Sequence, residues 1–451
     1  MNTLAFSERV WDELRLALAM DVESAGVIIA RPAEHAGKRT LLARETEWVP
    51  ERAYSRRDRL GLEIESAGYV PALKRAALDG SVAIFFHTHP GGDPSPSAWD
   101  IQVDEQIREA FQIRTGQRIY ASFILGGTPD LPSFSGRLWV NSKVSPIQRV
   151  RVAGERLQLF GVDHGPMNLD AFDRQIRAFG RAGQQTLAAV HVGVVGAGGT
   201  GSAVLEQLIR MGVGEVTVLD DDVVTSTNLT RIHESGRDQL GESKVVVAEV
   251  LARKVGLGTK VHAIRRRITE EDAARALTGC DAVFGCTDDN RGRAILSRLA
   301  YWYLLPVFDT AFLVDTSSTG GSPGLFGRVT IVSPGTACLF CRGRIDLQRL
   351  AAEALPDGER LRLANEGYVP GLPEPDPSVG AYTTMTGSLA VAEFLDRLFD
   401  FSTPPRPSEL LARVHDRAIS TNTASPRYGH FCADSGEWGQ GDTDPFLGLI
   451  W

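Results

Sequence analysis

Residues 192–208 constrain the fold of this chain more than any other stretch, because they read VGVVGAGGTGSAVLEQL. A short apolar strand runs directly into Gly196, Gly198 and Gly201, which follow the spacing G-x-G-x-x-G, and a helical pattern comes next. Glycines at these positions, with Gly199 beside them, let the backbone approach a phosphate, and the N-terminus of the helix adds N–H donors and a positive dipole. The motif therefore predicts a strand–turn–helix unit of a parallel sheet.

The segments around this motif alternate between strand and helix patterns. Short apolar runs rich in β-branched residues predict strands, and a 3.6-residue apolar period predicts helices. The expected strands are 191–195, 215–220, 260–265, 281–285 and 306–309, and the expected helices are 169–187, 202–212, 243–256, 270–277, 291–303 and 388–399. This order predicts an α/β domain with a mostly parallel, Rossmann-like sheet and helices on both of its faces.

The first part of the chain has a different pattern. Strands are expected at 26–30, 40–49, 81–87 and 119–126, and helices at 5–19, 66–78 and 98–113. These elements predict an α+β domain over residues 1–141, then a linker over 142–167 with proline, glycine and mixed charges, and then the α/β domain over 168–451. A chain of 451 residues is too long for a single hydrophobic core, which also favours two domains.

Composition excludes several classes of protein. A formal net charge of −8 argues against nucleic acid as a partner, and five cysteines do not make a secreted disulfide scaffold. No apolar run reaches the length of a membrane span, and the first residues lack a signal-peptide pattern. We therefore expect a soluble, cytoplasmic protein that binds neither nucleic acid nor membranes.

A histidine pair suggests metal chemistry in the first domain. His87 and His89 end an expected strand, where alternate side chains share a face, so both imidazoles can reach one ion. Ser97 opens the next expected helix, and Asp100 falls in its first turn. Two histidines and one aspartate with an open fourth position are typical of catalytic zinc, whose bound water ionises near neutral pH. Glu23, just before the strand GVIIA, is the expected general base.

Together these residues resemble the motif of the JAB/MPN (JAMM) metalloprotease family: a glutamate, then H-[ST]-H-P, then S-x-x-D. The resemblance covers about residues 1–141 and implies the cytidine-deaminase-like α+β fold of that family. It also implies cleavage of ubiquitin-like proteins from their attachments, with Glu23 as acid and base through the zinc water and Ser97 stabilising the oxyanion. A lone His-x-His pair is more often core packing, but Ser97 and Asp100 at this spacing favour the metal site.

A second set of polar residues follows the glycine motif. Asp220 ends the next expected strand and can hold a ribose hydroxyl, as it would in an NAD dehydrogenase. Asn228, Arg231 and Lys244 lie in TNLTRIHESGRDQLGESK, and Asp288 follows the strand DAVFGC. A single basic residue is usually solvated surface charge. ATP that is attacked at its α-phosphate, however, needs cations along the phosphates and a carboxylate for Mg²⁺, so the set as a whole favours ATP.

The order and spacing of GAGGTGS, VLDDD, TNLTR, GESK and CTDD resemble the ubiquitin-activating E1-like (ThiF/MoeB-type) adenylyltransferases over about residues 168–400. The resemblance implies that the residues from Gly196 to Gly201 hold the triphosphate and that Asp220 holds the ribose. It implies phosphate contacts for the residues Asn228, Arg231 and Lys244.

The same resemblance also implies roles for an aspartate after the strand DAVFGC and for an arginine near the start of the domain. Asp288 would bind Mg²⁺, but Asp289 adjoins it where the family has T-D-N, so which carboxylate holds the metal is open. Arg174, in FDRQIRAFGRAGQQTL, would reach the ATP of a partner subunit, so a homodimer is expected.

The cysteines depart from the family pattern. Cys338 and Cys341 resemble half of the paired C-x-x-C zinc site common in these enzymes, but Cys432 is followed three residues later by serine. Either His430 or Asp434 would complete a tetrahedral structural site, or the cysteines are small buried hydrophobes without metal.

Family members that form a thioester carry a cysteine before the helix that follows their crossover segment. Residues 365–391 contain none, and Cys280 and Cys286 flank an expected buried strand. We therefore expect adenylation without self-thioesterification.

These resemblances predict a bifunctional enzyme of a bacterial ubiquitin-like pathway that uses Zn²⁺, ATP and Mg²⁺. The α/β domain would adenylate the C-terminal carboxylate of a ubiquitin-like β-grasp protein, and the first domain would hydrolyse the (iso)peptide bond next to that terminus. An E2-like protein would be a further partner, and analogy with similar operons suggests antiphage defence. Two alternatives stay open: activation of a sulfur carrier with thiocarboxylate chemistry, and a non-catalytic sensor of nucleotide and metal.

Overall fold

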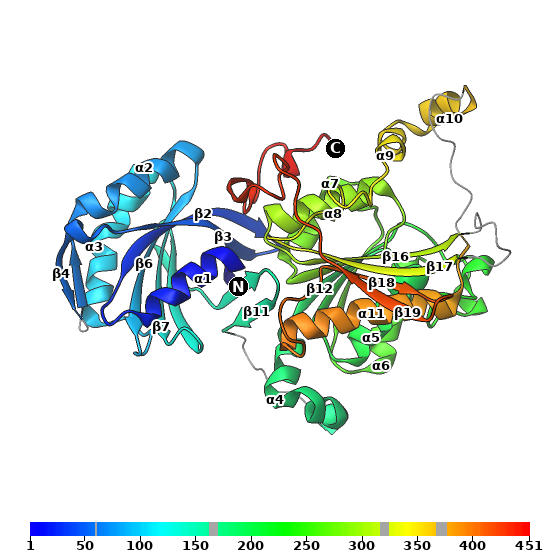
Figure 1. Cartoon of the computed structure of the whole chain (residues 1–451), viewed down its shortest axis with the longest axis horizontal. Coiled ribbons are helices and arrows are strands. Elements are labelled where there is room, and N and C mark those ends of the chain that lie inside the picture. Colours follow the sequence, from blue (N-terminus) through cyan, green and yellow to red (C-terminus); the bar gives the residue numbers. More distant parts are fainter. Residues whose placement is uncertain (59–60, 162–169, 316–323, 367–376) are drawn as a thin grey trace. The chain divides into compact units, whose positions relative to one another are not determined.

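The structure is a computed structural model that describes residues 1–58, 61–161, 170–315, 324–366 and 377–451. The chain forms two compact units, each with its own sheet (Figure 1). Unit 1 comprises Met1–Val162, Trp302–Leu304 and Ser435–Asp444. Unit 2 comprises Asp163–Tyr301, Leu305–Asp434 and Pro445–Trp451.

Unit 1 is built on a nine-stranded mixed sheet of order β11-β10-β1-β3-β2-β6-β7-β8-β9. Its strands are β1 (Asn2–Ser7), β2 (Ala25–His35), β3 (Lys38–Trp48), β6 (Val82–Pro90), β7 (Ile119–Gly127), β8 (Pro132–Val140), β9 (Lys143–Pro146), β10 (Arg149–Ala153) and β11 (Leu157–Phe160). A small hairpin of β4 (Tyr54–Asp58) and β5 (Gly61–Ile64) stands apart from this sheet. The β2–β3 hairpin turns at Ala36 and Gly37, whose φ angles of 48° and 73° are those of a tight hairpin turn.

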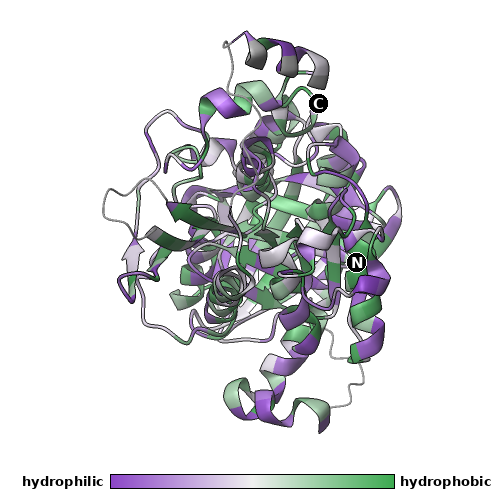
Figure 2. Cartoon of the chain, turned by 90° about the vertical axis from the view of Figure 1, so that its right-hand side faces the viewer, coloured by the Kyte–Doolittle hydropathy of each residue, from purple (hydrophilic) through white to green (hydrophobic). Residues whose placement is uncertain are grey.

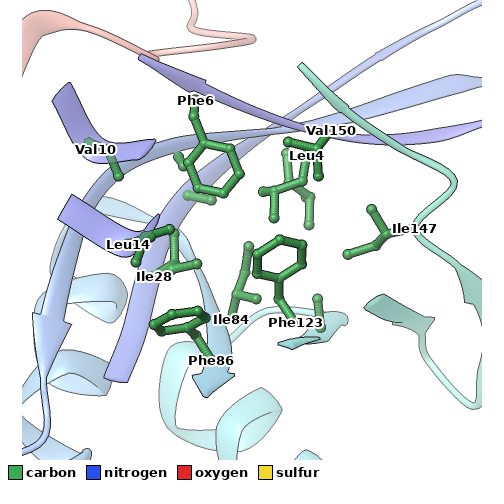
Figure 3. Packing of buried hydrophobic residues seen from close by; sticks show 14 of the residues in the cluster. Leu4, Phe6, Val10, Leu14, Ile28, Ile84, Phe86, Phe123, Ile147 and Val150 are labelled. Atoms are coloured by element: carbon green, nitrogen blue, oxygen red, sulfur yellow. The ribbon is translucent and has the colours of Figure 1, made fainter. Parts of the chain in front are cut away.

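Helices cover both faces of this sheet: α1 (Glu8–Leu16) on one face, and α2 (Val70–Asp79) with α3 (Ala98–Thr115) on the other. Neighbouring residues of a strand point to opposite faces, so β6 supplies Phe86 to the first core and Phe85 to the second. In the first core Phe123 packs against Phe6 and Phe86, with ring centroids 6.0 and 6.2 Å away (Figure 3). The sheet that carries the histidine pair is therefore held between two apolar layers.

Two parts of unit 1 differ from the expectation. Residues 5–7 belong to β1 rather than to a helix, because Leu4 and Phe6 are fully buried in a strand that pairs with β3 and β10. The segment 142–167, expected to be a linker, contributes β9, β10 and β11 to the sheet. The sequence did not predict β10 as a strand because it contains two arginines, which are usually exposed. In the structure Arg149 and Arg151 are buried, and Arg151 donates a hydrogen bond to the carbonyl of Tyr303 at 2.9 Å. Residues 162–169, with the expected boundary at 168, lie outside the described residues.

Unit 2 is built on an eight-stranded sheet of order β14-β13-β12-β15-β16-β17-β18-β19, parallel from β14 to β16 and antiparallel beyond. The strands are β12 (His191–Val195), β13 (Glu215–Leu219), β14 (Lys260–Ile264), β15 (Ala282–Gly285), β16 (Val307–Asp315), β17 (Gly324–Val332), β18 (Glu409–Arg413) and β19 (Ala418–Asn422). The helices are α4 (Asp173–Ala189), α5 (Gly199–Arg210), α6 (Lys244–Val255), α7 (Glu271–Ala276), α8 (Asn290–Trp302), α9 (Leu347–Glu353), α10 (Asp357–Asn365) and α11 (Gly380–Phe399).

Helices lie on both faces of this sheet, with α5, α6 and α11 on one side and α7 and α8 on the other (Figure 1). In Figure 2 the strands are mostly green, whereas the helices carry purple residues alongside green ones, as expected for helices with one buried face. The parallel α/β expectation is confirmed. The antiparallel extension from β17 to β19 was not expected, and α11 begins at Gly380 rather than near residue 388. Among the described residues no helix is both long and apolar enough to cross a membrane.

Candidate functional site

Three side chains of unit 1 converge where β6 ends and α3 begins. His87 Nε2 lies 3.1 Å from His89 Nε2 and 3.4 Å from Asp100 Oδ1, and the three ligand atoms all lie within 4.8 Å of one another. His89 Nδ1 lies 2.8 Å from the carbonyl of Asp93, so it carries the proton and leaves the Nε2 lone pair directed at the other ligands. Two imidazoles and a carboxylate arranged in this way fit a zinc ion.

The start of α3 fixes the position of Asp100. Ser97 and Asp100 form a capping box, in which Ser97 N donates to Asp100 Oδ2 at 2.7 Å and Asp100 N donates to Ser97 Oγ at 3.2 Å. Ser97 Oγ also donates to Asp100 Oδ2 at 2.7 Å, which leaves Oδ1 for the side of His87. Burial raises the pKa of Asp100, but hydrogen bonds from His87 and Ser97 outweigh it and hold the pKa below its usual range. Asp100 is therefore ionised, as a metal ligand must be.

One turn later on α3, Asp104 ties the helix to the sheet. The residue is 3% exposed, and its carboxylate accepts hydrogen bonds of 2.6 Å from both Tyr120 Oη and Ser122 Oγ. Arg137 on β8 forms an ion pair with the same carboxylate. Sequence reasoning missed this residue, although its spacing of four from Asp100 places both on one face of the helix.

Glu23 lies beside the histidines. Its Oε1 is 3.9 Å from His89 Nε2, and the residue is buried. Burial, reinforced by the charges of Asp100 and Asp58 and opposed by His87, raises the pKa of Glu23 to about 7. A carboxyl group with that pKa can both accept and return a proton near neutral pH, which is the property that a general base needs.

Arg57 holds the backbone on which Glu23 stands. Its Nε donates to the carbonyl of Glu23 at 2.8 Å, and its terminal nitrogen donates to Ser24 Oγ at 2.7 Å. Thr88, between the two histidines, binds the same segment, because its Oγ1 accepts from Ser24 N at 2.9 Å and its own N–H donates to the carbonyl of Ser24 at 2.9 Å. The threonine of the H-T-H-P sequence therefore fastens the glutamate segment to the histidine strand. No pattern in the sequence indicated this role for Arg57.

The glycine-rich turn of unit 2 is crowded by backbone. A Cβ added at Gly201 would lie 1.8 Å from the carbonyl oxygen of Gly196, and one at Gly196, whose φ is +90°, would lie 2.7 Å from that of Cys286. No side chain larger than hydrogen fits at either position without moving the backbone. The turn therefore packs directly against the N-terminus of α5 and the end of β15, leaving N–H groups of α5 at the carboxyl edge of the sheet.

Asp220, at the end of β13, supports this turn. Its Oδ2 accepts from Ala197 N at 2.7 Å, and its Oδ1 accepts from Asp222 N at 2.9 Å. Lys244 begins α6, with Nζ 3.8 Å from Asp220 Oδ1 and 2.7 Å from Asp222 Oδ2. Burial raises the pKa of Asp220, and the ammonium of Lys244 opposes the shift. The expected phosphate-binding lysine thus lies beside the expected ribose-binding carboxylate.

The structure also brings Arg231 and Asn228 to the turn. Arg231 Cδ lies 3.3 Å from the position that a Cβ of Gly199 would take, and its NH1 donates to the carbonyl of Thr227 at 2.9 Å. Asn228 is buried and accepts the N–H of Thr225 through Oδ1 at 3.1 Å, which closes the turn that carries Arg231. Thr383 of α11 reaches within 3.0 Å of the same position on Gly199, a neighbour that the sequence did not reveal.

The two adjacent aspartates after β15 differ in environment. Asp289 caps α8: its carboxylate accepts hydrogen bonds from Thr287 Oγ1 and from Gly292 N. Asp288 is exposed and forms no hydrogen bond or ion pair with the described part of the chain. Because a Cβ at Gly196 would come within 3.4 Å of Thr287 N, this loop lies beside the glycine turn. Asp288 is thus the carboxylate with free oxygens there, and it fits a Mg²⁺ ion.

Arg174 is exposed on α4 and also forms no hydrogen bond or ion pair with the described residues. Its expected contact with a partner subunit stays a prediction.

The cysteine cluster has a histidine as its fourth member. His430 Nδ1 lies 3.2 Å from Cys432 Sγ and 3.6 Å from Cys338 Sγ, and Cys341 Sγ lies 3.5 Å from Cys432 Sγ. The four ligand atoms lie within 4.8 Å of one another. Hydrogen bonding from Cys338, opposed by burial and helped by His430, lowers the pKa of Cys432 to about 5, toward the thiolate that binds zinc. Of the two candidates left open by the sequence, His430 is the one that joins the cysteines.

A sequence model of the ThiF family matches residues 172–427, which is more than half of the chain. The chain belongs to the ThiF family. A model of the RadC-like JAB domain matches residues 70–136. That match includes both histidines of the candidate metal site as well as Ser97 and Asp100, and it begins after Glu23. Both resemblances inferred from the motifs are confirmed at the level of family.

Curated relatives of this ThiF-family chain match about two fifths of it. The SAMP-activating enzyme E1 of Haloferax volcanii is 29% identical over 175 residues, which cover 38% of this chain and 61% of the relative. The sulfur carrier protein adenylyltransferase of Thermus thermophilus is 32% identical over 178 residues, covering 38% of this chain and 64% of the relative. The chain therefore spans less than two thirds of either relative. A solved structure of E. coli MccB with MccA-N7isoASN is 17% identical, with a TM-score of 0.48, and the match covers 59% of this chain and 76% of that one.

Proposed function

We propose that this ThiF-family protein activates a C-terminal carboxylate as an acyl-adenylate with ATP and Mg²⁺. The proposal rests on one observation: three features lie together at the carboxyl edge of the unit 2 sheet. They are the glycine turn, the guanidinium of Arg231 next to it, and the exposed carboxylate of Asp288. Ligands of open α/β sheets bind at this edge.

In this reaction an oxygen of the substrate carboxylate attacks the α-phosphorus of ATP, the bond to the bridging oxygen breaks, and pyrophosphate leaves. The N–H groups of α5 and the guanidinium of Arg231 would hold the phosphate oxygens as negative charge builds on the leaving group. Lys244 would exchange Asp222 for a phosphate oxygen, while Asp220 keeps the turn in place through Ala197. Asp288 would bind Mg²⁺, which neutralises the phosphate charge when bound.

For unit 1 we propose zinc-dependent hydrolysis of the amide bond next to the same carboxylate. His87, His89 and Asp100 would hold the ion, which when bound supplies a Lewis acid and an acidic water. Glu23, with its pKa raised to about 7, would take up the proton of the nucleophile and deliver it to the leaving amine. Ser97 is engaged with Asp100, so in this arrangement it positions a ligand, and its predicted oxyanion role would require it to turn.

The substrate that fits both activities is the tail of a ubiquitin-like β-grasp protein in a bacterial modification pathway. The names of relatives support this class, because one is an E1 that activates SAMP and another adenylates a sulfur carrier protein. Burial raises the pKa of Cys286 to about 12, and Cys280 is fully buried, so neither is a nucleophile. The acyl group would therefore pass to a thiol of an E2-like protein, or to sulfide if the partner is a sulfur carrier. We further propose that the protein forms a homodimer in which Arg174 reaches the ATP of the partner subunit. Its proposed location is the cytoplasm, and its proposed biological role is antiphage defence.

ATP–pyrophosphate exchange by the full chain, stimulated by a β-grasp protein from a neighbouring gene, tests the activation step. Asp288→Asn preserves shape and should lower exchange at least a hundredfold while leaving the melting temperature unchanged, because Asp288 forms no hydrogen bond or ion pair with the described residues. Asp289→Asn is the matched control: it should lower the melting temperature and retain most of the exchange. Full exchange in Asp288→Asn would refute the assignment, and absence of exchange with every such protein would refute the activity.

The hydrolytic step is tested with the same β-grasp protein extended by a short C-terminal peptide. Wild-type protein loaded with zinc should release the peptide, and Glu23→Gln should lose release while retaining zinc. Cleavage at the wild-type rate by Glu23→Gln would exclude the proposed role of this residue.

A further inference from the structure

A third group of nitrogen and oxygen ligands lies in unit 2, away from the glycine turn. His191 is the first residue of β12 and Glu215 the first of β13, and the two are paired in the sheet. His262, on the edge strand β14, is paired with Thr217, two residues after Glu215. Residues paired across strands, or two apart on one strand, share a face, so all these side chains lie on one face. The group occupies the amino ends of the parallel strands, whereas the nucleotide-binding features occupy the carboxyl ends.

The ligand atoms of the three side chains lie close together. His262 Nε2 lies 3.4 Å from Glu215 Oε2, and His191 Nδ1 lies 3.9 Å from the same oxygen. All three ligand atoms are within 4.8 Å of one another.

The surroundings of His191 suit a metal-binding imidazole. His191 Nε2 lies 2.9 Å from Thr217 Oγ1, and His191 Nδ1 lies 3.1 Å from the carbonyl oxygen of Gly279. An imidazole can carry its proton on either nitrogen. Without a metal ion, His191 Nδ1–H donates to the carbonyl of Gly279, as His89 Nδ1–H does to that of Asp93. A metal ion bound at Nδ1 would move the proton to Nε2, from which the ring donates to Thr217 Oγ1, and a hydrogen bond from the other ring nitrogen is what fixes most metal-binding histidines. The carbonyl of Gly279 is then available as an additional oxygen ligand.

We propose that His191, Glu215 and His262 form a site for a divalent transition metal ion of the zinc type. Two imidazoles and one carboxylate favour zinc over magnesium or calcium, which prefer all-oxygen sites. His191 is buried and fixes one ligand, whereas the side chains of Glu215 and His262 are 31% and 51% exposed, so an ion can enter from solvent. The bound ion joins β12, β13 and the edge strand β14, and so ties the exposed edge of the sheet to its centre. This site does not depend on the proposed enzymatic activities.

Counting bound zinc tests the proposal. Metal-free full-length protein is equilibrated with Zn²⁺ at a buffered free concentration, and bound metal is measured by atomic emission. His262→Ala should bind one equivalent less than the wild type, and Glu215→Gln should bind the same equivalent at least tenfold more weakly. His415→Ala is the matched control, since His415 is a partly exposed histidine of unit 2 outside all the ligand groups.

Cobalt separates this site from the cysteine cluster. The proposed site has no thiolate, so His262→Ala should leave the sulfur-to-cobalt charge-transfer absorption unchanged while one equivalent of cobalt is lost. Equal metal content and affinity in the wild type, His262→Ala and Glu215→Gln would overturn the proposal. His262 is half exposed, so its replacement should not unfold the sheet, and Glu215→Gln provides an independent test that keeps the side-chain shape.

Discussion

Asp104 offers a direct test of how α3, the helix that carries Asp100, is held to the sheet. Replacing it with alanine leaves the hydroxyls of Tyr120 and Ser122 without their acceptor and the guanidinium of Arg137 without its carboxylate. A buried polar group left without a partner costs about 1–3 kcal/mol, and removing one partner of a buried ion pair costs about 3–5 kcal/mol. Because the Arg137 side chain is 21% exposed and water can replace part of its lost contact, we expect Asp104→Ala to lower the free energy of unfolding of unit 1 by about 3–4 kcal/mol.

Two further variants show whether the loss of unfolding free energy comes from the carboxylate charge of Asp104. Asp104→Asn keeps the shape and one acceptor oxygen but loses the charge, so it should cost about 1–2 kcal/mol, close to the difference between charged and neutral hydrogen bonds. Glu109→Ala, an exposed acid on the same helix, should stay within about 0.5 kcal/mol of the wild type.

Urea denaturation followed by tryptophan fluorescence measures these values. The signal reports mainly on unit 1, because that unit contains all the tryptophans except Trp451: Trp11, Trp48, Trp99, Trp139, Trp302 and Trp438. Asp104→Ala should also weaken zinc binding, since Asp100 lies one turn earlier on the helix. A loss below about 1 kcal/mol in Asp104→Ala, or an equal loss in the alanine and asparagine variants, would refute the reasoning.

Two further predictions follow from the geometry of unit 2. Gly201→Ala forces a Cβ to within 1.8 Å of the Gly196 carbonyl oxygen, so it should lower the free energy of unfolding by about 1–3 kcal/mol in thermal melts and weaken ATP binding in calorimetry. Gly198→Ala is the control, because its Cβ would meet nothing within 4 Å, and it should melt like the wild type. Equal melting temperatures for the two variants would contradict the close packing at Gly201. If the cysteine cluster binds zinc as expected, His430→Ala should lose that zinc, measured by metal content, whereas Asp434→Ala should retain it. The reverse result would make Asp434 the fourth ligand.

The sequence predicted features that are encoded locally. The strand 191–195 was placed at the observed ends of β12, because an apolar run that enters a glycine turn has few other interpretations. The same holds for His87, His89 and Asp100, whose convergence follows from the period of a strand and the first turn of a helix.

Features that depend on distant pairing could not be predicted. β10 contains charged residues, and it is a strand because β1 pairs with it across more than a hundred residues of sequence. Arg57 holds Glu23 from a separate hairpin, and no local pattern marks an arginine for that task. His430 and Asp434 were equally near Cys432 along the chain, and only the folded path of the backbone separates them.

The discontinuity of unit 1 has a consequence for how this protein is made. Ribosomal synthesis releases the N-terminal end first, and N-terminal domains usually fold first. Here unit 1 also includes residues 302–304 and 435–444: Asp442 accepts the N–H of Glu34, and the carbonyl of Gly436 accepts from Arg44. Unit 1 therefore reaches its full set of contacts only after residue 444 has left the ribosome. A nascent chain stalled before residue 435 should leave that unit more sensitive to protease than the released protein.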